Sequence, residues 1–280
     1  MDWSQIAGFG VAGNFTGHLE QAGESPDFVH VKVQEATAPK GIFPFYLPNV
    51  DGHSLSCNPY SSTEIQLLNL HEDHQIEPEV SILFEVTYRN GFVAALQPLQ
   101  AMAHNDCSIR RKGANKISEK KNWGACSKGV SEASIPLSDI SKGSTLDEYV
   151  LGCYLIRDGV LHTYGVTSKV NDYSYFHDTL LNWLVSKFNT QQDYGPLENI
   201  SQCLADAEYP RQVCISVGAT RYTPYGQKTF LQPDDIACVV LYNPQEYSVE
   251  QIEQHLLSSD SQLPDASILK QNVIFNSEQS

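Results

Sequence analysis

Two glutamates separated by a single residue stand immediately before an apolar stretch in the first third of the chain. The tripeptide Glu77-Pro78-Glu79 leads into 80–88, VSILFEVTY, parts of which alternate between apolar and polar residues and predict a strand. Because side chains two residues apart on a strand point to the same face, the two carboxylates are expected to lie side by side. Their mutual repulsion must then be relieved by solvent, by protonation or by a bound cation.

A third carboxylate, Asp106, follows the apolar stretch 92–103 within the sequence His104-Asn105-Asp106. Three carboxylates, with waters and substrate oxygens completing an octahedron, suit a hard divalent cation such as Mg²⁺ or Mn²⁺, with Ca²⁺ as an alternative. The competing interpretation is a solvated acidic entrance to a strand, which is common in a chain that has 33 acidic residues. Spacing alone leaves both interpretations open.

Short strands predominate among the elements that must position these carboxylates. The segments 149–156 and 160–166 are joined by Arg157-Asp158-Gly159, whose Asp-Gly pair is typical of a hairpin turn. Helices are predicted over 175–188, where apolar residues fall on one face, and over 248–257, which opens with a capping box. Further strands are predicted at 28–33, 80–88, 92–96, 213–217 and 236–241, and a glycine-rich turn with a short helix within 8–24.

This order of elements favours a β-rich α+β fold. Strands outnumber helices, and no strand–helix–strand alternation indicates a parallel sheet. Residues 259–280 are polar and are expected to form a loosely attached tail.

The composition is that of a folded, acidic protein. Of 280 residues, 41% are hydrophobic and 10% aromatic, which excludes a disordered chain. The 18 basic and 33 acidic residues give a net charge of −15, so nucleic acid and anionic membrane surfaces are poor partners. No stretch reaches the ~18 apolar residues of a membrane helix, and no secretory signal is expected. Seven scattered cysteines without a C-x-x-C pair are typical of reduced thiols and predict a cytoplasmic location.

Six short segments resemble, in the same order, motifs of the fumarylacetoacetate hydrolase superfamily. The stretch 10–18, GVAGNFTGH, looks like the family's G-x-N-Y-x-x-H opening, and Glu77-x-Glu79 is similar to its E-x-E metal motif. The others are Asn105-Asp106-x-Ser108-x-Arg110 (N-D-x-S-x-R-D), Trp123 with Lys128 and Pro136-Leu137 (W…K…P-L), Asp158-Gly159-x-Leu161 with Gly165-x-Thr167-Ser168 (N-G-x-x…G-N-T-S), and Leu231-Gln232-Pro233-Asp234-Asp235-Ile236 (L-x-P-G-D-V).

The resemblance implies the family's mixed β-sandwich roll with a few peripheral helices. It also implies a metal held by Glu77, Glu79 and Asp106, with Lys128 neutralising an enolate or a carboxylate. The implied organisation is an N-terminal segment, 1–60, that contributes to the active site, a catalytic domain over 61–245, and a C-terminal helix and tail over 246–280.

One departure from the family concerns the base that activates water. The resemblance assigns this role to His18, polarised by an acid that would stand at position 21. This chain has Gln21 instead, so Glu20 or Glu24 would have to replace that acid, and Glu20 is taken as the catalytic candidate. Decarboxylation and tautomerisation need no attacking water and tolerate this loss better than hydrolysis does.

The implied substrate is a small 2-oxo or β-diketo acid, cleaved or decarboxylated through a metal-stabilised enolate by a hydrolase or lyase. The alternative is a non-catalytic or regulatory metal- or ligand-binding protein of the same fold. A homodimer is expected on the same resemblance. The residues expected to contact the anionic substrate are Arg110, Lys40, Thr220 and Tyr222.

Overall fold

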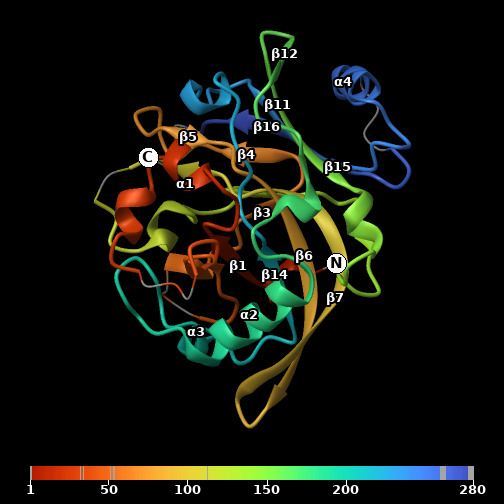
Figure 1. Ribbon diagram of the computed structural model, residues 1–280. Coiled ribbons are helices and arrows are strands. Elements are labelled where there is room, and N and C mark those ends of the chain that lie inside the picture. Colours follow the sequence, from red (N-terminus) through yellow and green to blue (C-terminus); the bar gives the residue numbers. More distant parts are fainter. Residues whose placement is uncertain are drawn as a thin grey trace.

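A long hairpin carries the carboxylates that the sequence singles out (Figure 1). The structure is a computed structural model that describes residues 2–31, 33, 35–50, 52, 54–111, 113–258 and 263–276. Strands β6 (Pro78–Arg89) and β7 (Phe92–Asn105) pair antiparallel around Asn90 and Gly91, whose positive φ values of 53° and 80° suit an Asn-Gly hairpin turn. The register sets Pro78 opposite Asn105, so the start of β6 meets the end of β7.

These two strands belong to a sheet that has eight strands within the described residues. β1 (Ala7–Ala12) pairs parallel with β14 (Gln212–Ser216) and antiparallel with β2 (Gly41–Tyr46), so the N-terminal strand lies in the same sheet as the hairpin. The spatial order is β2, β1, β14, β6, β7, β9 (Lys128–Val130) and β3 (Tyr60–Ser61), with β10 (Ile135–Pro136) paired to β7.

A second sheet packs against one face of the first, and apolar side chains fill the space between them. Val80 and Ile82 of β6 point into this core, so Glu79, which precedes Val80, points to the opposite face together with Ser81. The order in the second sheet is β12 (Val160–Thr163), β11 (Val150–Arg157), β15 (Ile236–Tyr242), β16 (Ser267–Ile274) and β4 (Glu64–Gln66), with β13 (Ser168–Lys169) paired to β11. β5 (His74–Gln75) and β8 (Ser108–Ile109) form a separate small pair.

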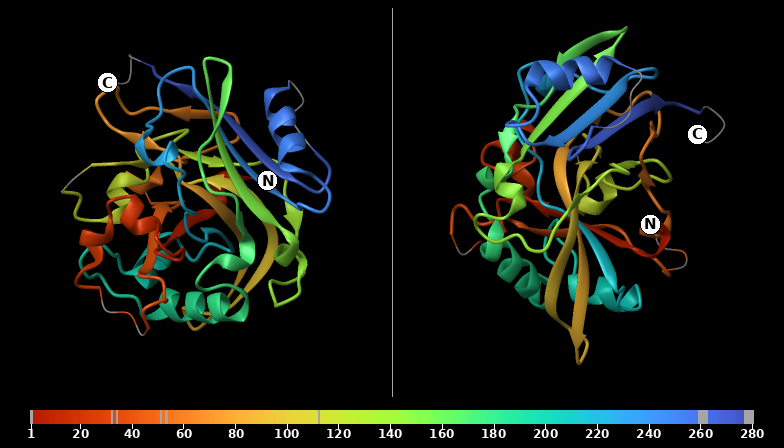
Figure 2. Two further views of the ribbon diagram at one scale, coloured as in Figure 1. Left: turned by 45° about the horizontal axis from the view of Figure 1, so that its top comes forward. Right: turned by 90° about the vertical axis from the view of Figure 1, so that its right-hand side faces the viewer.

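Helices cover the two ends of this sandwich. Figure 2 shows α2 and α3 near one end of the molecule and α4 against the second sheet at the other. The rings of Phe188 in α2 and Phe9 in β1 meet edge to face at 5.1 Å, while Ile252 and Leu256 of α4 are buried against β11 and β15. The α-helices are α1 (His18–Gln21), α2 (His177–Thr190), α3 (Ile200–Asp206) and α4 (Val249–Leu257). The 3-10 helices are η1 (Trp3–Gln5), η2 (Ser25–Phe28), η3 (Ser54–Ser56), η4 (Ile117–Lys120), η5 (Thr145–Glu148), η6 (Val170–Asp172) and η7 (Gly226–Lys228).

The predicted β-rich α+β fold is confirmed, as are most of its elements. The expected helices correspond to α1, α2 and α4, and the Ser248–Gln251 capping box is present at the start of α4. Among the described residues, no helix combines the length and the apolar character that crossing a membrane requires. The confirmed strands are β6, β7, β11, β12, β14 and β15.

The prediction of a strand at 28–33 is wrong. In the described part of that segment, Phe28 ends η2, and Val29 and His30 form a turn. Phe28 packs into an apolar cluster, whereas the Val29 side chain is 73% exposed. Alternation of apolar and polar residues indicates a strand only where a neighbouring strand is available for pairing, and this segment has none in the described structure.

The polar C-terminal segment is not a loose tail in its described part. β16 lies between β15 and β4, and its Leu269 side chain is fully buried in the core between the sheets. The buried Gln271 side chain accepts a hydrogen bond from Asn105 Nδ2 (3.1 Å) and donates one to the Glu64 carbonyl (2.7 Å). The polar residues of β16 conceal from the sequence analysis that it is a central strand. Their side chains can be buried because they form hydrogen bonds with distant parts of the chain.

We predict that Leu269→Ala lowers the free energy of unfolding by about 2–5 kcal/mol, because it removes a buried side chain and leaves a cavity. The matched control is Asn272→Ala, an exposed position of the same strand, which should change stability by less than about 0.5 kcal/mol. Urea unfolding followed by circular dichroism measures both. Equal, negligible effects would mean that β16 is dispensable for the fold.

Candidate metal centre

Three buried carboxylates converge where β6 begins and β7 ends. Glu77, Glu79 and Asp106, called the acidic triad below, are at most 3% exposed, and each offers an oxygen within 4.8 Å of the others. The amide of Asp106 donates to the Glu77 carbonyl (2.9 Å), which ties the end of β7 to the start of β6. The structure thus brings together the three carboxylates that the sequence predicts as metal ligands.

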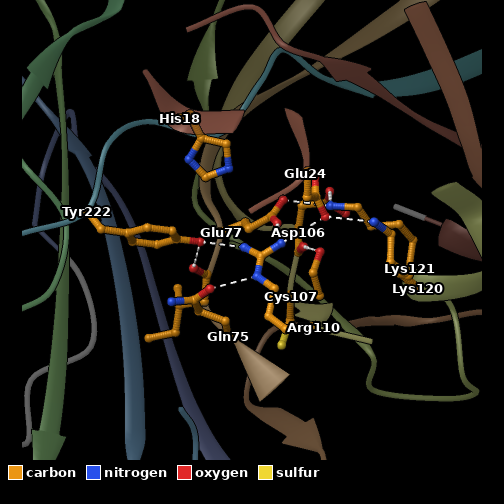
Figure 3. A network of polar contacts seen from close by, with 12 residues as sticks. His18, Glu24, Gln75, Glu77, Asp106, Cys107, Arg110, Lys120, Lys121 and Tyr222 are labelled. Carbon is orange, nitrogen blue, oxygen red and sulfur yellow. Dashed lines mark hydrogen bonds and ion pairs between the residues drawn. The ribbon is translucent and has the colours of Figure 1, made fainter. Parts of the chain in front are cut away.

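An ammonium group lies between two members of the triad (Figure 3). Lys121 Nζ is 2.6 Å from Glu77 Oε2 and 2.5 Å from Asp106 Oδ2, and its side chain is 3% exposed. Burial disfavours a charged lysine, but Asp106 and Glu77 outweigh it and raise the pKa of Lys121 above its usual value. Burial likewise opposes ionisation of Glu77, yet Lys121 and Arg110 hold the pKa of that carboxyl well below its usual range. Both groups are therefore charged.

A second buried lysine, Lys128 of β9, contacts Asp106 from the other side. Its Nζ is 2.9 Å from Asp106 Oδ1 and donates to the Cys107 carbonyl at 2.5 Å. Burial lowers the pKa of Lys128, the Asp106 carboxylate opposes that effect, and the neighbouring Lys121 adds to it. Lys128 thus stands beside the triad, where the sequence places it.

Arg110 joins the triad to three other parts of the chain (Figure 3). Its Nη1 contacts Glu77 Oε1 (2.7 Å) and Glu24 Oε1 (3.0 Å). Its Nε donates to Gln75 Oε1 (2.6 Å), and its Nη2 donates to the Tyr222 hydroxyl (2.8 Å). The guanidinium is 10% exposed and holds Glu77 and the Tyr222 ring in place.

The third triad carboxyl, Glu79, has a different environment. Its Oε2 accepts a hydrogen bond from the Gly218 amide (2.8 Å). Burial, and then the nearby Asp106 carboxylate, raise the pKa of Glu79 well above its usual value. A divalent cation beside this oxygen would relieve both effects.

His18 begins α1 and faces the same network. Its Nδ1 lies 2.9 Å from the Thr220 carbonyl, and because a carbonyl can only accept, Nδ1 carries the proton and Nε2 the basic lone pair. The side chain is 5% exposed, and burial lowers the pKa of the imidazole. His18 is therefore a neutral imidazole at neutral pH.

The carboxylate expected to polarise His18 is not Glu20. Glu20 is exposed and follows His18 by two residues on α1, a spacing that puts the two side chains on different faces. Gln21 makes two hydrogen bonds with the Tyr222 backbone, donating to its carbonyl (3.1 Å) and accepting from its amide (2.9 Å). A carboxylate could not donate, so glutamine suits this position. Glu24 is the acid that reaches the network.

Glu24 is itself engaged by two cations. Its Oε1 contacts Arg110 Nη1 and, at 2.9 Å, Lys120 Nζ, and Lys120 also contacts Asp27 Oδ2 (3.1 Å). Burial opposes its ionisation, but Arg110 lowers the pKa of Glu24. Glu24 acts on His18 through its charge and not through a hydrogen bond in the described network.

The cavity at this site is small. Its volume is about 20 Å³, enough for roughly one water molecule. Phe28 of η2 and Ile117 of η4, which belong to one apolar cluster, are among the apolar residues that line it. The polar groups that line it are His18, Glu24, Glu77, Glu79 and Lys121.

Of the remaining residues that are predicted to contact the substrate, two adjoin the triad and one does not. The Thr220 amide donates to the Pro78 carbonyl (3.1 Å), and the Tyr222 hydroxyl donates to the Ile76 carbonyl (2.8 Å), so both adjoin the triad. Lys40 lies apart from them, in a groove of about 430 Å³ that it lines with residues at the C-terminal end of α2. Contact of any of these residues with a substrate stays a prediction.

The sequence analysis does not identify Lys120 and Lys121 as site residues, because a pair of lysines in a polar stretch is typical of a solvent-exposed loop. One signal was available. The segment 110–121, RRKGANKISEKK, holds six of the chain's 18 basic residues, an unusual local density in a protein with a net charge of −15. Several of these bases face the buried carboxylates.

The donor set fits a hard divalent cation. It consists of carboxylate oxygens that lie close together, and such oxygens are the ligands that Mg²⁺ and Mn²⁺ prefer. The protein's own cations depart from this pattern, because Lys121 contacts two of the three carboxylates. Arg110 also contacts Glu77, and Lys128 also contacts Asp106.

Comparisons with known proteins agree with this fold. A model of a family of unknown function, DUF5718, matches residues 24–273. No curated protein matches the chain in sequence.

Several solved structures share the architecture at low sequence identity. A 5-carboxymethyl-2-hydroxymuconate delta-isomerase from Mycobacterium smegmatis has a TM-score of 0.54 and 13% identity, over 96% of this chain and 79% of that one. A 2-keto-3-deoxyarabinonate dehydratase has a TM-score of 0.52 and 15% identity, over 96% and 73%. A protein from Yersinia pestis CO92, named as a fumarylacetoacetate hydrolase family protein, has a TM-score of 0.51 and 12% identity, over 96% and 94%. The resemblance to that family is confirmed at the level of the fold.

We predict that Arg110→Met lowers the free energy of unfolding by about 3–5 kcal/mol, because it leaves the Glu24 and Glu77 carboxylates buried with one partner fewer. The adjacent Arg111 has a 34% exposed side chain with one ion pair, to Glu72 (2.9 Å), so Arg111→Met should cost less than about 1 kcal/mol. Denaturant unfolding of the two variants tests this. A cost for Arg110→Met that matches the Arg111 control would show that the guanidinium does not organise the site.

Proposed function

The chain belongs to the family of unknown function DUF5718, and from that premise we propose that it is a divalent-metal-dependent enzyme acting on a small 2-oxo or β-diketo acid. The observation that carries the proposal is the acidic triad, three carboxyl groups buried within 4.8 Å of one another and flanked by Lys128 and Arg110. The chain's own cations contact Glu77 and Asp106. Glu79 instead accepts a hydrogen bond from the Gly218 amide and lies near the Asp106 carboxylate, a repulsion that a bound cation would relieve. We propose Mg²⁺ or Mn²⁺ as that ion.

When bound, the divalent cation supplies positive charge opposite the two adjacent oxygens of a 2-oxo acid. The protein's own cations add to that charge. Lys128, fixed by Asp106 and the Cys107 carbonyl, is placed to neutralise the negative charge that develops as a carbon–carbon bond breaks. The Arg110 guanidinium contacts both Glu77 and the Tyr222 hydroxyl and so fixes their positions relative to each other.

Among the possible reactions, the surroundings of His18 favour decarboxylation over hydrolysis. A base that activates water gains strength from a carboxylate on its second nitrogen, but His18 Nδ1 bonds to a neutral carbonyl. In decarboxylation of a β-carboxylated 2-oxo acid, the bond to the carboxylate breaks and CO₂ leaves. The electron pair forms the enolate, and a proton then adds to carbon. This sequence requires no attacking water.

A non-catalytic, ligand-binding protein of the same fold is the second candidate. The contact of Lys121 with two triad carboxylates favours it, because those carboxylates already have a counter-charge. The two candidates differ in turnover. For both candidates we propose a small anionic ligand and a homodimer, on the basis of the family resemblance. We also propose a cytoplasmic location, on the basis of the scattered cysteines.

We predict that chelator-treated protein supplied with Mg²⁺ or Mn²⁺ decarboxylates oxaloacetate, or hydrolyses an acylpyruvate such as acetylpyruvate. Pyruvate release, measured by a coupled assay, should fall by about 10²-fold or more in Asp106→Asn and Glu79→Gln, because each variant removes a ligand of the proposed cation, whose positive charge stabilises the enolate. Because free metal ions also decarboxylate oxaloacetate, rates are taken relative to the same metal without protein.

The matched control is Glu85→Gln, a surface position of β6 that forms an ion pair with Arg211 (2.7 Å). It should retain full activity. Metal binding without turnover of either substrate class would favour the ligand-binding candidate, and activity that survives in both triad variants would remove the triad from the reaction.

A further inference from the structure

Lys121 occupies a position with respect to two carboxylates that a metal ion would also need. Its Nζ lies 2.6 Å from Glu77 Oε2 and 2.5 Å from Asp106 Oδ2. Oxygen ligands of divalent cations lie at about 2.0–2.6 Å from the ion. An ammonium ion and a divalent cation cannot both fill this place, because their centres would overlap and their like charges would repel.

The surroundings of Lys121 show where its ammonium can go. The residue follows η4, and its side chain lines the small cavity together with His18 and Glu24. Glu24 already attracts the Lys121 charge through space. A rotation of the side chain away from Asp106 therefore keeps the ammonium at the cavity wall, beside a carboxylate and beside the volume in which an anionic ligand would lie.

The neighbouring Lys120 does not share this position. It contacts Glu24 (2.9 Å) and Asp27 (3.1 Å), whereas the ion pairs of Lys121 are with the triad. Two adjacent lysines of equal charge and similar burial thus differ in whether they obstruct the carboxylates. This difference supplies an internal control.

We propose that Lys121 is a tethered competitor for the divalent cation, which gives up the triad when metal and an anionic ligand bind together. The proposal rests on the proposed metal-dependent function. Without a ligand, the apparent metal affinity is the intrinsic affinity multiplied by the small fraction of molecules in which Lys121 has left the triad. With an anion present, the displaced ammonium gains a partner, so metal and anion strengthen each other's binding, as linkage requires.

The test is calorimetric titration of Mn²⁺ into chelator-treated full-length protein, with and without oxalate. We expect Lys121→Met to bind Mn²⁺ at least about 10-fold more tightly than the wild type in the absence of oxalate. Oxalate should enhance Mn²⁺ binding more in the wild type than in this variant. Lys120→Met and the charge-conserving Lys121→Arg should both resemble the wild type, and Asp106→Asn should bind no metal.

Loss of Lys121 also leaves the buried Glu77 and Asp106 carboxylates with one cationic partner fewer, so the methionine variant is expected to be less stable before metal is added. Lys121→Gln carries the same expectation with a polar side chain. For either variant, thermal unfolding gives a second measurement, since Mn²⁺ should raise the Tm by more than it does in the wild type.

The outcomes separate this inference from the proposed function. Equal Mn²⁺ affinity in the wild type and Lys121→Met would overturn the role of Lys121 and leave the metal-dependent function standing. Metal binding by Lys121→Met alone, with none by the wild type even with oxalate, would overturn both the release of Lys121 by metal and anion and the metal dependence of the natural protein. Binding by none of the proteins would overturn both.

Discussion

Buried carboxylates must be compensated, and much of the site follows from that requirement. The acidic triad and Glu24 lie in an interior where an uncompensated charge costs several kcal/mol. Four cations meet them, and these come from β9 and from the single segment 110–121. That segment must therefore fold back over the ends of β6 and β7. Its position is set by charge pairing as well as by the apolar contacts of Ile117.

The local sequence pattern predicts the carboxylates of this site, whereas contacts between distant parts of the chain determine which cations pair with them. The alternation of β6 is enough to place Glu77 and Glu79 on one face, because the period of a strand is a local property. Nothing local indicates that Lys121 returns to Asp106, since that contact depends on the path of the intervening loop. For the same reason the sequence does not reveal β16 as a buried strand. Its Gln271 side chain accepts a hydrogen bond from Asn105, which lies 166 residues away along the chain. The sequence leaves Glu20 and Glu24 as alternatives because the faces of so short a helix depend on where it begins, and the structure places Glu24 in the network and leaves Glu20 exposed.

An aromatic wall separates the cations from water. Lys121 Nζ lies 5.1 Å from the centre of the Phe43 ring, and Lys128 Nζ lies 5.9 Å from that of Phe45. Both rings fit because Gly8 and Gly10 of β1 have no side chain, and a Cβ at either glycine would come within 2.2 Å of a ring carbon. The glycines of this strand thus serve close packing of aromatic rings. The wall also lowers the local dielectric constant, which strengthens each ion pair behind it.

The size of the cavity has a consequence for how fast any ligand binds. A space of about 20 Å³ holds one water molecule and no organic acid, so the described conformation has to open before a ligand enters. Phe28 and Ile117 are among the apolar side chains that line this space. The observed association rate then stops rising with ligand concentration once it reaches the rate of opening, on the microsecond-to-millisecond scale of loop motions. Weaker apolar packing around the cavity would raise this maximum association rate while leaving the carboxylates unchanged.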